Sequence, residues 1–452
     1  MTSTNTMQEG RGRAGLILVL LAMSYMLSLF DRQLLVLMIG PIKRDMVVSD
    51  TEFSLLYGFA FTLFYSSLSL VAAPLVERFN RTRLLAFALV LWSLATAASG
   101  LVSSFSGLFV ARMLVGVGEA TLAPVAYALI ADLFRPHQRT QAFSIYATGM
   151  FVGIGLSFFL GGHLIQMLDR LPPIVLPGVG AVRGWQLAFL AASVPGLVVA
   201  FGFVVAGEPA RSLPAPGQTK APGWGEFLRA FRQTGSTLLF HHLAFALLIG
   251  QGFANALWLP TLFGRARHWS LGEVGVVFAI AAVTAGLAGA YLGPRTILRL
   301  QQRGLQDAPL RVCAYTCGLG AAGALMATLA GHAWVAVFGV WLTFFATSVA
   351  AGPAAAAVQL LMPAWAQGRC GAFFTFFTQL LGSSLVPLAI GWAGQHLFPG
   401  GGIGPALAMV APVTYGLAGA LLWRIRDRFI PHADARPAEE PALRGAALRS
   451  PT

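Results

Sequence analysis

Long apolar stretches separated by short polar segments recur along the whole chain. Each stretch is long enough to cross the roughly 30 Å hydrocarbon core of a bilayer as a helix of about 20 residues. We expect twelve such helices, at residues 14–37, 52–76, 84–104, 106–131, 140–167, 184–206, 236–263, 271–294, 312–331, 333–362, 370–397 and 402–423. The pattern therefore predicts an all-α integral membrane protein.

The composition excludes several other classes of protein. Of the 452 residues, 56% are hydrophobic and 10% are charged, whereas soluble domains carry about 25% charged residues. Neither lysine, Lys43 or Lys220, follows a glycine, so there is no P-loop for ATP. The hydrolase motifs His-Glu-x-x-His and Gly-x-Ser-x-Gly do not occur, and the three cysteines have no metal-ligand spacing. We expect neither an enzyme nor a bound metal or cofactor.

The net charge of +13 follows the predicted topology and does not indicate a nucleic-acid-binding face. When the N-terminus is placed inside, the inner segments hold 22 Lys and Arg residues and the outer segments hold 6. The positive-inside rule then puts both termini in the cytoplasm. The first apolar run is too long for a cleavable signal peptide and is predicted to stay as the first helix. We expect a monomeric protein of the bacterial inner membrane with no nucleic-acid partner.

The spans divide into two six-helix halves with a weak internal repeat. Arg139 and Gly161 in the first half recur as Arg369 and Gly391 in the second, at an offset of 230. Parallel repeats build one large class of transporters, whose substrate sites lie near the bilayer midplane between the halves. The expected parts are an N-terminal half (1–206), a cytoplasmic central loop (207–235), a C-terminal half (236–425) and a cytoplasmic tail (426–452) predicted to be disordered. Within the loop, residues 224–232 have the apolar spacing of a helix on the membrane surface.

Two spans carry charged residues at membrane depth: Asp31 and Arg32 in the first, and Arg112 and Glu119 in the fourth. Such a charge costs about 2.5–3.5 kcal/mol on insertion scales, so these residues are predicted to belong to a solute or ion pathway. Arg112 and Glu119 share one helix face but lie two turns, roughly 10 Å, apart. We therefore expect the charged residues of the first span to complete a network with them.

Glu119 is the first candidate for a proton carrier, because a carboxylate in a low-dielectric site can exchange protons near neutral pH. A permanent ion pair with an arginine, or contact with a substrate headgroup, is the alternative for Glu119 and for Asp31. Neighbours on a helix point about 100° apart, so Asp31 and Arg32 are not expected to pair with each other. Arg32 and Arg112 suit bidentate binding of a phosphate or carboxylate, although a structural role in the network is favoured for Arg112.

Polar residues at membrane depth in the second half are uncharged. The candidates for lining a cavity are Tyr25 from the first half and Gln251, Asn255, Gln359 and Gln379 from the second. An apolar wall is expected from Phe344, Phe345, Phe373, Phe374, Phe376 and Phe377. Charge in one half and aromatic rings in the other suit an amphiphile, but helix packing or lipid contact explains the same rings. His241 and His242 are expected to lie near the membrane interface or in contact with water.

The stretch from Pro74 to Arg83 resembles the loop signature of the major facilitator superfamily, Gly-x-x-x-Asp-Arg-x-Gly-Arg-Arg/Lys. Glu77 stands for the aspartate, and Ala73 and Asn80 stand for two of the glycines. The resemblance implies a cytoplasmic gate that forms and breaks with conformation. The residues expected in the gate are Glu77, Arg78, Arg81, Asp132 and Arg139. Positive-inside charge alone is the alternative explanation of this loop.

Three further segments are similar to motifs of the same superfamily. They are Arg112-x-x-x-Gly116-x-Gly118-Glu119 in the fourth span, Gly149-x-x-x-Gly153-x-Gly155 in the fifth, and Glu208-Pro-Ala-Arg211 in the central loop. The fourth-span motif, the Asp31-Arg32 pair and the sequence Ile-Ala-Asp-Leu-Phe at 130–134 are together similar to the Spinster family. The resemblance implies twelve helices in two halves related by a pseudo-two-fold axis, and a carrier of lysolipid-like or sphingolipid-like molecules coupled to protons.

The expected function is a secondary active transporter that works by alternating access, coupled to protons, for a small amphiphilic or anionic solute. A proton symporter or exporter for organic acids or drugs would use the same fold, and Arg32 and Arg112 would suit an acid. A membrane sensor that transports nothing is a different class, but the tail after Arg428 is short and unpatterned for an effector region. A scramblase-like lipid channel would act without a gradient.

Overall fold

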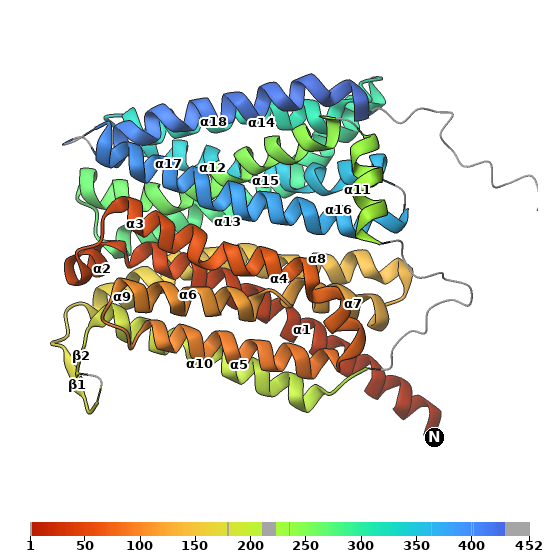
Figure 1. The fold of residues 1–452 in the computed structure, drawn as a ribbon, viewed down its shortest axis with the longest axis horizontal. Coiled ribbons are helices and arrows are strands. Elements are labelled where there is room, and N and C mark those ends of the chain that lie inside the picture. The colour runs from red at the N-terminus through yellow and green to blue at the C-terminus, as the bar shows by residue number, and fades with distance from the viewer. Residues whose placement is uncertain are drawn as a thin grey trace, which may run out of the picture.

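The computed structural model describes residues 2–178, 180–209, 223–234, 236–362, 364–398, 400 and 402–429. Within these residues, twelve helical segments are long and apolar enough to cross a membrane, which confirms the predicted all-α membrane fold. The N-terminus and α11 (Trp224–Gln233) lie at one end of the bundle, which we call the terminal side (Figure 1). The short helix α2 (Ile39–Met46) lies at the opposite end, the distal side.

Spans one to six form the lower group of helices in Figure 1. Their elements are α1 (Thr2–Leu37), α3 (Asp50–Leu55), η1 (Leu56–Ala60), α4 (Phe61–Arg78), α5 (Arg81–Ser99), α6 (Phe105–Glu119), α7 (Leu122–Leu133), α8 (Pro136–Leu156), η2 (Ser157–Gly161), α9 (Gly162–Leu168) and α10 (Gly184–Ala206). A hairpin of β1 (Ile174–Leu176) and β2 (Gly180–Val182) lies on the distal side. Hydropathy did not predict this hairpin, because its strands are only three residues long.

Spans seven to twelve form the upper group (Figure 1). Their elements are α12 (Ser236–Arg267), α13 (Leu271–Gln302), α14 (Ala308–Leu329), α15 (Ala333–Leu361), α16 (Ala364–Phe376), η3 (Phe377–Gly382), α17 (Ser383–His396), α18 (Ile403–Ile425) and the short η4 (Arg426–Phe429). The eighth span runs eight residues beyond its predicted end at 294, because Pro294 lies inside α13 and does not stop it. A proline within a helix removes one hydrogen bond and bends the helix without always ending it.

The helix predicted at 224–232 is present as α11 and runs across the ends of the spans (Figure 1). Its apolar face packs on α16: Phe227 is fully buried, and the Phe227 and Phe373 rings meet edge to face at 6.1 Å between centroids. Trp224 and Leu228, at the margin of the same apolar stripe, stay exposed. This partition fits an amphipathic helix with one face on the protein and bulky apolar side chains left outward.

Glycines let helices approach closely at the positions where the sequence shows small residues four apart. A Cβ added at Gly149 or Gly153 of α8 would collide with the backbone of Ala22 or Met26 in α1. At Gly289 of α13, an added Cβ would lie 2.7 Å from the Cβ of Ser348 in α15. At Gly293 an added Cβ would lie 3.2 Å from Val349 of α15, so both glycine pairs act as helix-packing faces.

The two groups of helices share one hydrophobic core towards the distal side. The larger core cluster joins Met38 and Phe53 of the first group to Trp258 and Phe263 of the second. A separate cluster, with Ile17 and other residues towards the terminal side, belongs to the first group alone. Three of the spans that meet across the boundary contain a π-helical turn, η1, η2 or η3. Such turns mark functional sites in many helices.

Candidate functional site

A cavity of about 320 Å³ lies between the two groups of helices, within the size range of small-molecule sites. Its polar lining residues are Tyr25, Ser28, Arg32, Gln33, Tyr65, Glu119 and Tyr146 from the first group, and Thr347, Ser348, Thr375, Thr378 and Gln379 from the second. Apolar side chains such as Phe151, Ile154, Phe253 and Phe344 fill the rest of the wall. The cavity therefore offers an apolar space with charge on one side only.

Arg112 and Asp31 form a buried ion pair beside the cavity. The Arg112 Nη1 donates to Asp31 Oδ2 at 2.7 Å, and the Thr96 hydroxyl donates to Asp31 Oδ1 at 3.3 Å. Both charged residues are at most 3% exposed, and neither is among the residues that line the cavity. Because a lone charge at this depth would be costly, the pair holds α1 and α6 together electrostatically.

Arg32 and Glu119 form a second ion pair, and this one lies in the cavity wall. Arg32 Nη2 and Nε donate to Glu119 Oε2 at 2.9 and 3.3 Å, and Ser28 Oγ donates to the same oxygen at 2.5 Å. The other oxygen, Glu119 Oε1, is buried and has no hydrogen-bond partner in the described structure. One carboxylate oxygen is thus saturated while the other stays available to a proton or a ligand donor.

The Arg32 guanidinium is also held by aromatic rings. Its Cζ lies 3.9 Å from the centroid of the Phe61 ring and 4.8 Å from that of Tyr65, within the range of cation–π attraction. These rings come from α4, so Arg32 of the first span contacts both the second and the fourth span. The pairing agrees with the expectation that neighbours on one helix face different partners, because Asp31 turns to Arg112 and Arg32 to Glu119.

A break in the fourth span places Glu119 at this point. The helix α6 ends at Glu119 and α7 begins at Leu122. Pro124 has no N–H to donate to the carbonyl of Ala120 four residues earlier, and the Ser69 hydroxyl donates to that carbonyl instead, at 3.3 Å. The local sequence thereby breaks the helix and leaves its acidic end beside Arg32.

Only some of the other residues predicted to line the cavity do so. Tyr25 and Gln379 do line it. Gln251 and Asn255 are buried but face α18, where Gln251 Nε2 donates to Asn255 Oδ1 at 2.8 Å and Asn255 Nδ2 donates to Tyr415 Oη at 3.2 Å. The side chain of Gln359 lies outside the described part of the structure. Whether a polar residue faces the cavity depends on how its helix is rotated about its own axis. The spacing of residues along one helix does not give that rotation.

The predicted aromatic wall is only partly in the cavity. Phe344 lines it, whereas Phe373, Phe374 and Phe377 pack around His242 in α12. His241 and His242 are fully buried in this cluster, so the expectation that they are solvated was wrong. The imidazole Nδ1 of His242 lies 2.7 Å from the Leu238 carbonyl oxygen, and the rings around it exclude water.

The predicted gate residues gather at the terminal side of the first group. Arg81 at the start of α5 forms an ion pair with Asp132 near the end of α7. Arg139 donates to the carbonyls of Phe134 and Ala131 at 3.1 and 2.8 Å, so it caps the end of α7. Glu77 and Arg78 are exposed at the end of α4. Arg81 and Asp132 thus join the loop to the end of the fourth span within one half.

Several residues of the site were missed from the sequence, notably Ser28, Tyr65 and Tyr146. Ser28 is four residues before Arg32, and that spacing puts both side chains on one face of α1. A polar residue one helical turn from an intramembrane charge therefore indicates a further residue of the same site. Tyr146 stacks on Tyr25 at 4.9 Å between centroids, but nothing in its local sequence indicates this contact.

Comparison with known proteins decides the family. The model of the major facilitator superfamily matches residues 21–387. The chain belongs to the major facilitator superfamily. It is accordingly a membrane transporter of the secondary type and not an enzyme.

An "MFS-type efflux pump" of Mycolicibacterium smegmatis is 27% identical over 428 residues, covering 93% of this chain and 95% of that protein. Human "Protein spinster homolog 1" is 30% identical over 344 residues, covering 71% of this chain and 61% of that protein.

Solved structures show the same fold. A bacterial homologue of the human lysosomal transporter Spinster superposes with a TM-score of 0.73 at 22% identity, covering 92% of this chain and 96% of that one. A D-xylose–proton symporter superposes with a TM-score of 0.62 at 14% identity, covering 92% and 96%. The predicted similarity to the Spinster family is therefore confirmed by sequence relatives and by fold alike.

Proposed function

We propose that this protein is a proton-coupled carrier of small amphiphilic molecules that works by alternating access. The observation that carries the proposal is the buried Glu119 in the cavity wall, bound to Arg32 through one oxygen and unpartnered at the other. In a transporter cavity, such a carboxylate supports exchange between a proton and a substrate. The lining of the same cavity, charged on one side and apolar elsewhere, supports an amphiphile as the substrate.

The coupling step that we propose is competition at Arg32. While Glu119 is ionised, its Oε2 holds the guanidinium at 2.9 Å. A proton on Glu119 would remove the negative charge and leave Arg32 with the Phe61 and Tyr65 rings. Arg32 could then bind an anionic headgroup with bidentate geometry. Asp31 and Arg112 would keep α1 and α6 together throughout, since their pair is buried away from the cavity.

The resemblance to Spinster proteins makes a lysolipid-like or sphingolipid-like molecule the first candidate substrate. A second candidate is an amphiphilic drug, because the relative from Mycolicibacterium smegmatis is named an efflux pump. A shorter match, 33% identical over 156 residues, is the puromycin resistance protein of Streptomyces alboniger. A small organic acid is less suited to the site, since it would leave most of the apolar wall of the cavity without contact.

The remaining parts of the proposal concern topology. We place both termini and α11 in the cytoplasm of a bacterial cell, with the protein in the inner membrane as a monomer. The excess of Lys and Arg in the segments of the terminal side supports this orientation. The Arg81–Asp132 pair then lies on the cytoplasmic face, where a gate would form and break with conformation.

Transport by the purified protein in liposomes tests this function. We would load proteoliposomes with an imposed pH gradient and follow three radiolabelled probes: a lysophospholipid, puromycin and benzoate. We expect gradient-dependent movement of the lysophospholipid or of puromycin, abolished by a protonophore, and none of benzoate. Movement that is equal in protein-free liposomes for all three would contradict the proposal. Movement that needs the protein but no gradient would favour a lipid channel.

A further inference from the structure

The connection between the fifth and sixth spans places an apolar segment on the distal side. Residues 171–182, which contain β1 and β2, carry no charged side chain and no polar side chain. Val175 is 75% exposed, and Leu171, Ile174 and Ala181 are exposed as well. Contiguous exposed apolar residues indicate a surface that meets a partner or a membrane. We call residues 171–182 the distal hairpin.

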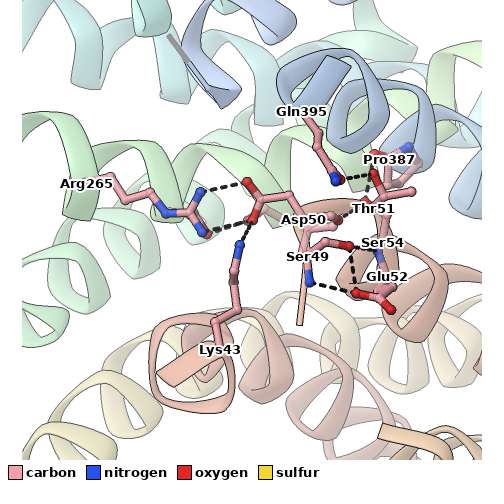
Figure 2. Close-up of polar contacts among 11 residues, drawn as sticks. Lys43, Ser49, Asp50, Thr51, Glu52, Ser54, Arg265, Pro387 and Gln395 are labelled. Carbon is pink, nitrogen blue, oxygen red and sulfur yellow. Dashed lines mark hydrogen bonds and ion pairs between the residues drawn. The ribbon is translucent and has the colours of Figure 1, made fainter. Parts of the chain in front are cut away.

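The connection between the first and second spans, also on the distal side, is polar by contrast. Lys43 donates there to the Asp50 carboxylate, which also accepts from Arg265 of α12 (Figure 2). Charged groups of this kind suit a surface in water. Val47 on the same connection is 91% exposed, but a single exposed apolar residue is ordinary at a protein surface. The distal hairpin therefore differs in kind from this neighbouring surface.

The base of the distal hairpin is fixed to the first half. Arg44 of α2 binds Asp169 just before the hairpin at 2.6 Å, and the Trp185 indole just after it donates to Asp45 of α2 at 2.6 Å. A Cβ added at Gly184 would lie 2.5 Å from the backbone at the end of α9, so the two ends of the segment touch. The hairpin thus starts from a defined position beside the spans.

The distal hairpin projects beyond the first group of helices and away from the second group (Figure 1). In the adjoining spans, Met167 of α9 and Val194 of α10 are exposed and do not line the cavity. They belong to the apolar surface with which a transmembrane helix meets lipid. Because Leu171 follows Met167 by one turn of chain and is exposed too, the apolar surface of the spans continues into the hairpin.

A lipid surface suits the distal hairpin better than a strand from a second protein chain. Pro173 and Pro177 adjoin β1 on either side and have no N–H, so this edge offers few donors to another strand. A lone two-stranded hairpin is also only marginally stable in water. Its unpaired backbone groups would find no partner in hydrocarbon. The headgroup region satisfies both needs, since it provides water to the backbone and acyl chains to the side chains.

Arginines at both ends of the distal hairpin fit the same location. Arg170 precedes the hairpin, Arg183 follows it, and both are exposed, although Arg183 also pairs with Asp45. Basic side chains at a membrane surface are attracted to lipid phosphates, while apolar side chains between them reach the acyl chains. The segment therefore has the charge pattern of the membrane–water interface.

We propose that the distal hairpin is a membrane anchor, in which Ile174 and Val175 enter the boundary between headgroups and acyl chains of the leaflet on the distal side. Arg170 and Arg183 then lie at the level of the lipid phosphates. Because the base of the hairpin is bound to α2, the anchor fixes the depth of the distal end of the first half. The inference goes beyond the proposed function: it needs the membrane fold alone and is independent of substrate and of proton coupling.

Fluorescence quenching of the full chain in lipid nanodiscs tests the anchor. Cys313, Cys317 and Cys370 are buried and would first be replaced by alanine. A single cysteine at Val175, or at Val47 as the matched control, would then carry a fluorophore. Both positions are exposed valines of the distal side. The nanodiscs would contain phosphatidylcholine and phosphatidylglycerol, with or without bromine near the top of the acyl chains, and iodide would be the quencher in water.

We expect brominated lipid to quench the label at Val175→Cys roughly threefold or more as strongly as the label at Val47→Cys, because an interfacial segment lies about 5–10 Å into the headgroup–acyl boundary. Iodide should quench the two labels in the reverse order, since Val47 is surrounded by water in this account.

A charged hairpin provides a second test. The label is placed at Ala181→Cys, the residue opposite Val175 in the hairpin. Ile174→Asp combined with Val175→Asp should remove most of the quenching by brominated lipid, because carboxylates are costly at the acyl-chain boundary. Ile174→Leu combined with Val175→Leu is the control that keeps the apolar surface, and it should retain the quenching.

Two results would overturn the anchor. The first is quenching by brominated lipid that is equal at Val175 and Val47, with iodide reaching both, because the hairpin would then lie in water. The second is a label at Val175 that neither quencher reaches, because another protein surface would then cover the hairpin. Thermal unfolding of each variant establishes that it is folded. Neither result bears on transport, so the proposed function stands or falls separately.

Discussion

Two adjacent residues of α1 in this transporter form ion pairs with different partners. Asp31 pairs with Arg112 away from the cavity, while Arg32 pairs with Glu119 in its wall. The first pair does not line the cavity, so its energetic role is to hold α1 against α6. The second lines the cavity, and its buried Glu119 Oε1 has no hydrogen-bond partner in the described structure. Position in the cavity wall, rather than burial, therefore distinguishes the two pairs.

Replacing one member of the buried pair tests its structural role. Arg112→Gln leaves the Asp31 carboxylate without its cation, a loss of about 3–5 kcal/mol for a buried pair. We expect the apparent melting temperature of the purified protein to fall by roughly 5–10 °C. The double variant Asp31→Asn with Arg112→Gln removes both charges and should recover most of this loss. A double variant as unstable as the single would show that the ion pair is not what Arg112 contributes.

Close helix contacts set the positions of these residues. The face of α8 at Gly149 and Gly153 lies directly against α1, near Met26 and two turns before Arg32. A change of separation between α1 and α8 would displace both pairs of charges, since Asp31 and Arg32 are carried by α1. The break between α6 and α7, where the Ser69 hydroxyl donates to the Ala120 carbonyl, also sets the position of Glu119.

A methyl group at the α1–α8 contact should therefore be costly. The Cβ of Gly153→Ala would meet the Met26 carbonyl oxygen, and such overpacking costs about 1–3 kcal/mol. The control is Gly318→Ala in α14, where an added Cβ meets nothing within 4 Å. There alanine should stabilise the helix by about 0.5–1 kcal/mol. Thermal unfolding compares the two, and a Gly153→Ala protein as stable as Gly318→Ala would contradict the packing argument.

At the scale of the whole molecule, hydropathy alone predicted twelve spans that match the structure closely. The sixth, for example, was expected at 184–206 and is Gly184–Ala206. Hydropathy does not predict which side chains of different helices contact each other, because these contacts depend on how each helix is rotated. Gln251 and Asn255 were predicted to face the cavity but face Tyr415. Lys43 and Arg265 counted only as outer charges in the sequence, although the fold brings both to Asp50.

The orientation in the membrane gives a further prediction. In a protein whose three buried cysteines, Cys313, Cys317 and Cys370, are replaced by alanine, Val47→Cys on the distal side should react with an impermeant maleimide in intact cells. Arg303→Cys on the terminal side should react only after the cells are permeabilised. Both expectations follow from the excess of Lys and Arg on the terminal side. The reverse pattern would put both termini outside and contradict the proposed topology.

The central claim is that Glu119 couples substrate movement to protons, and substrate-evoked proton flux measures this most directly. Proteoliposomes with an internal pH dye would receive the probe that the transport assay identifies, using the wild type, Glu119→Gln and the control Glu273→Gln. Glu273 is exposed at the start of α13 and does not line the cavity. We predict flux in the wild type and in Glu273→Gln, and a loss of at least tenfold in Glu119→Gln. Flux of wild-type size in Glu119→Gln would contradict the account.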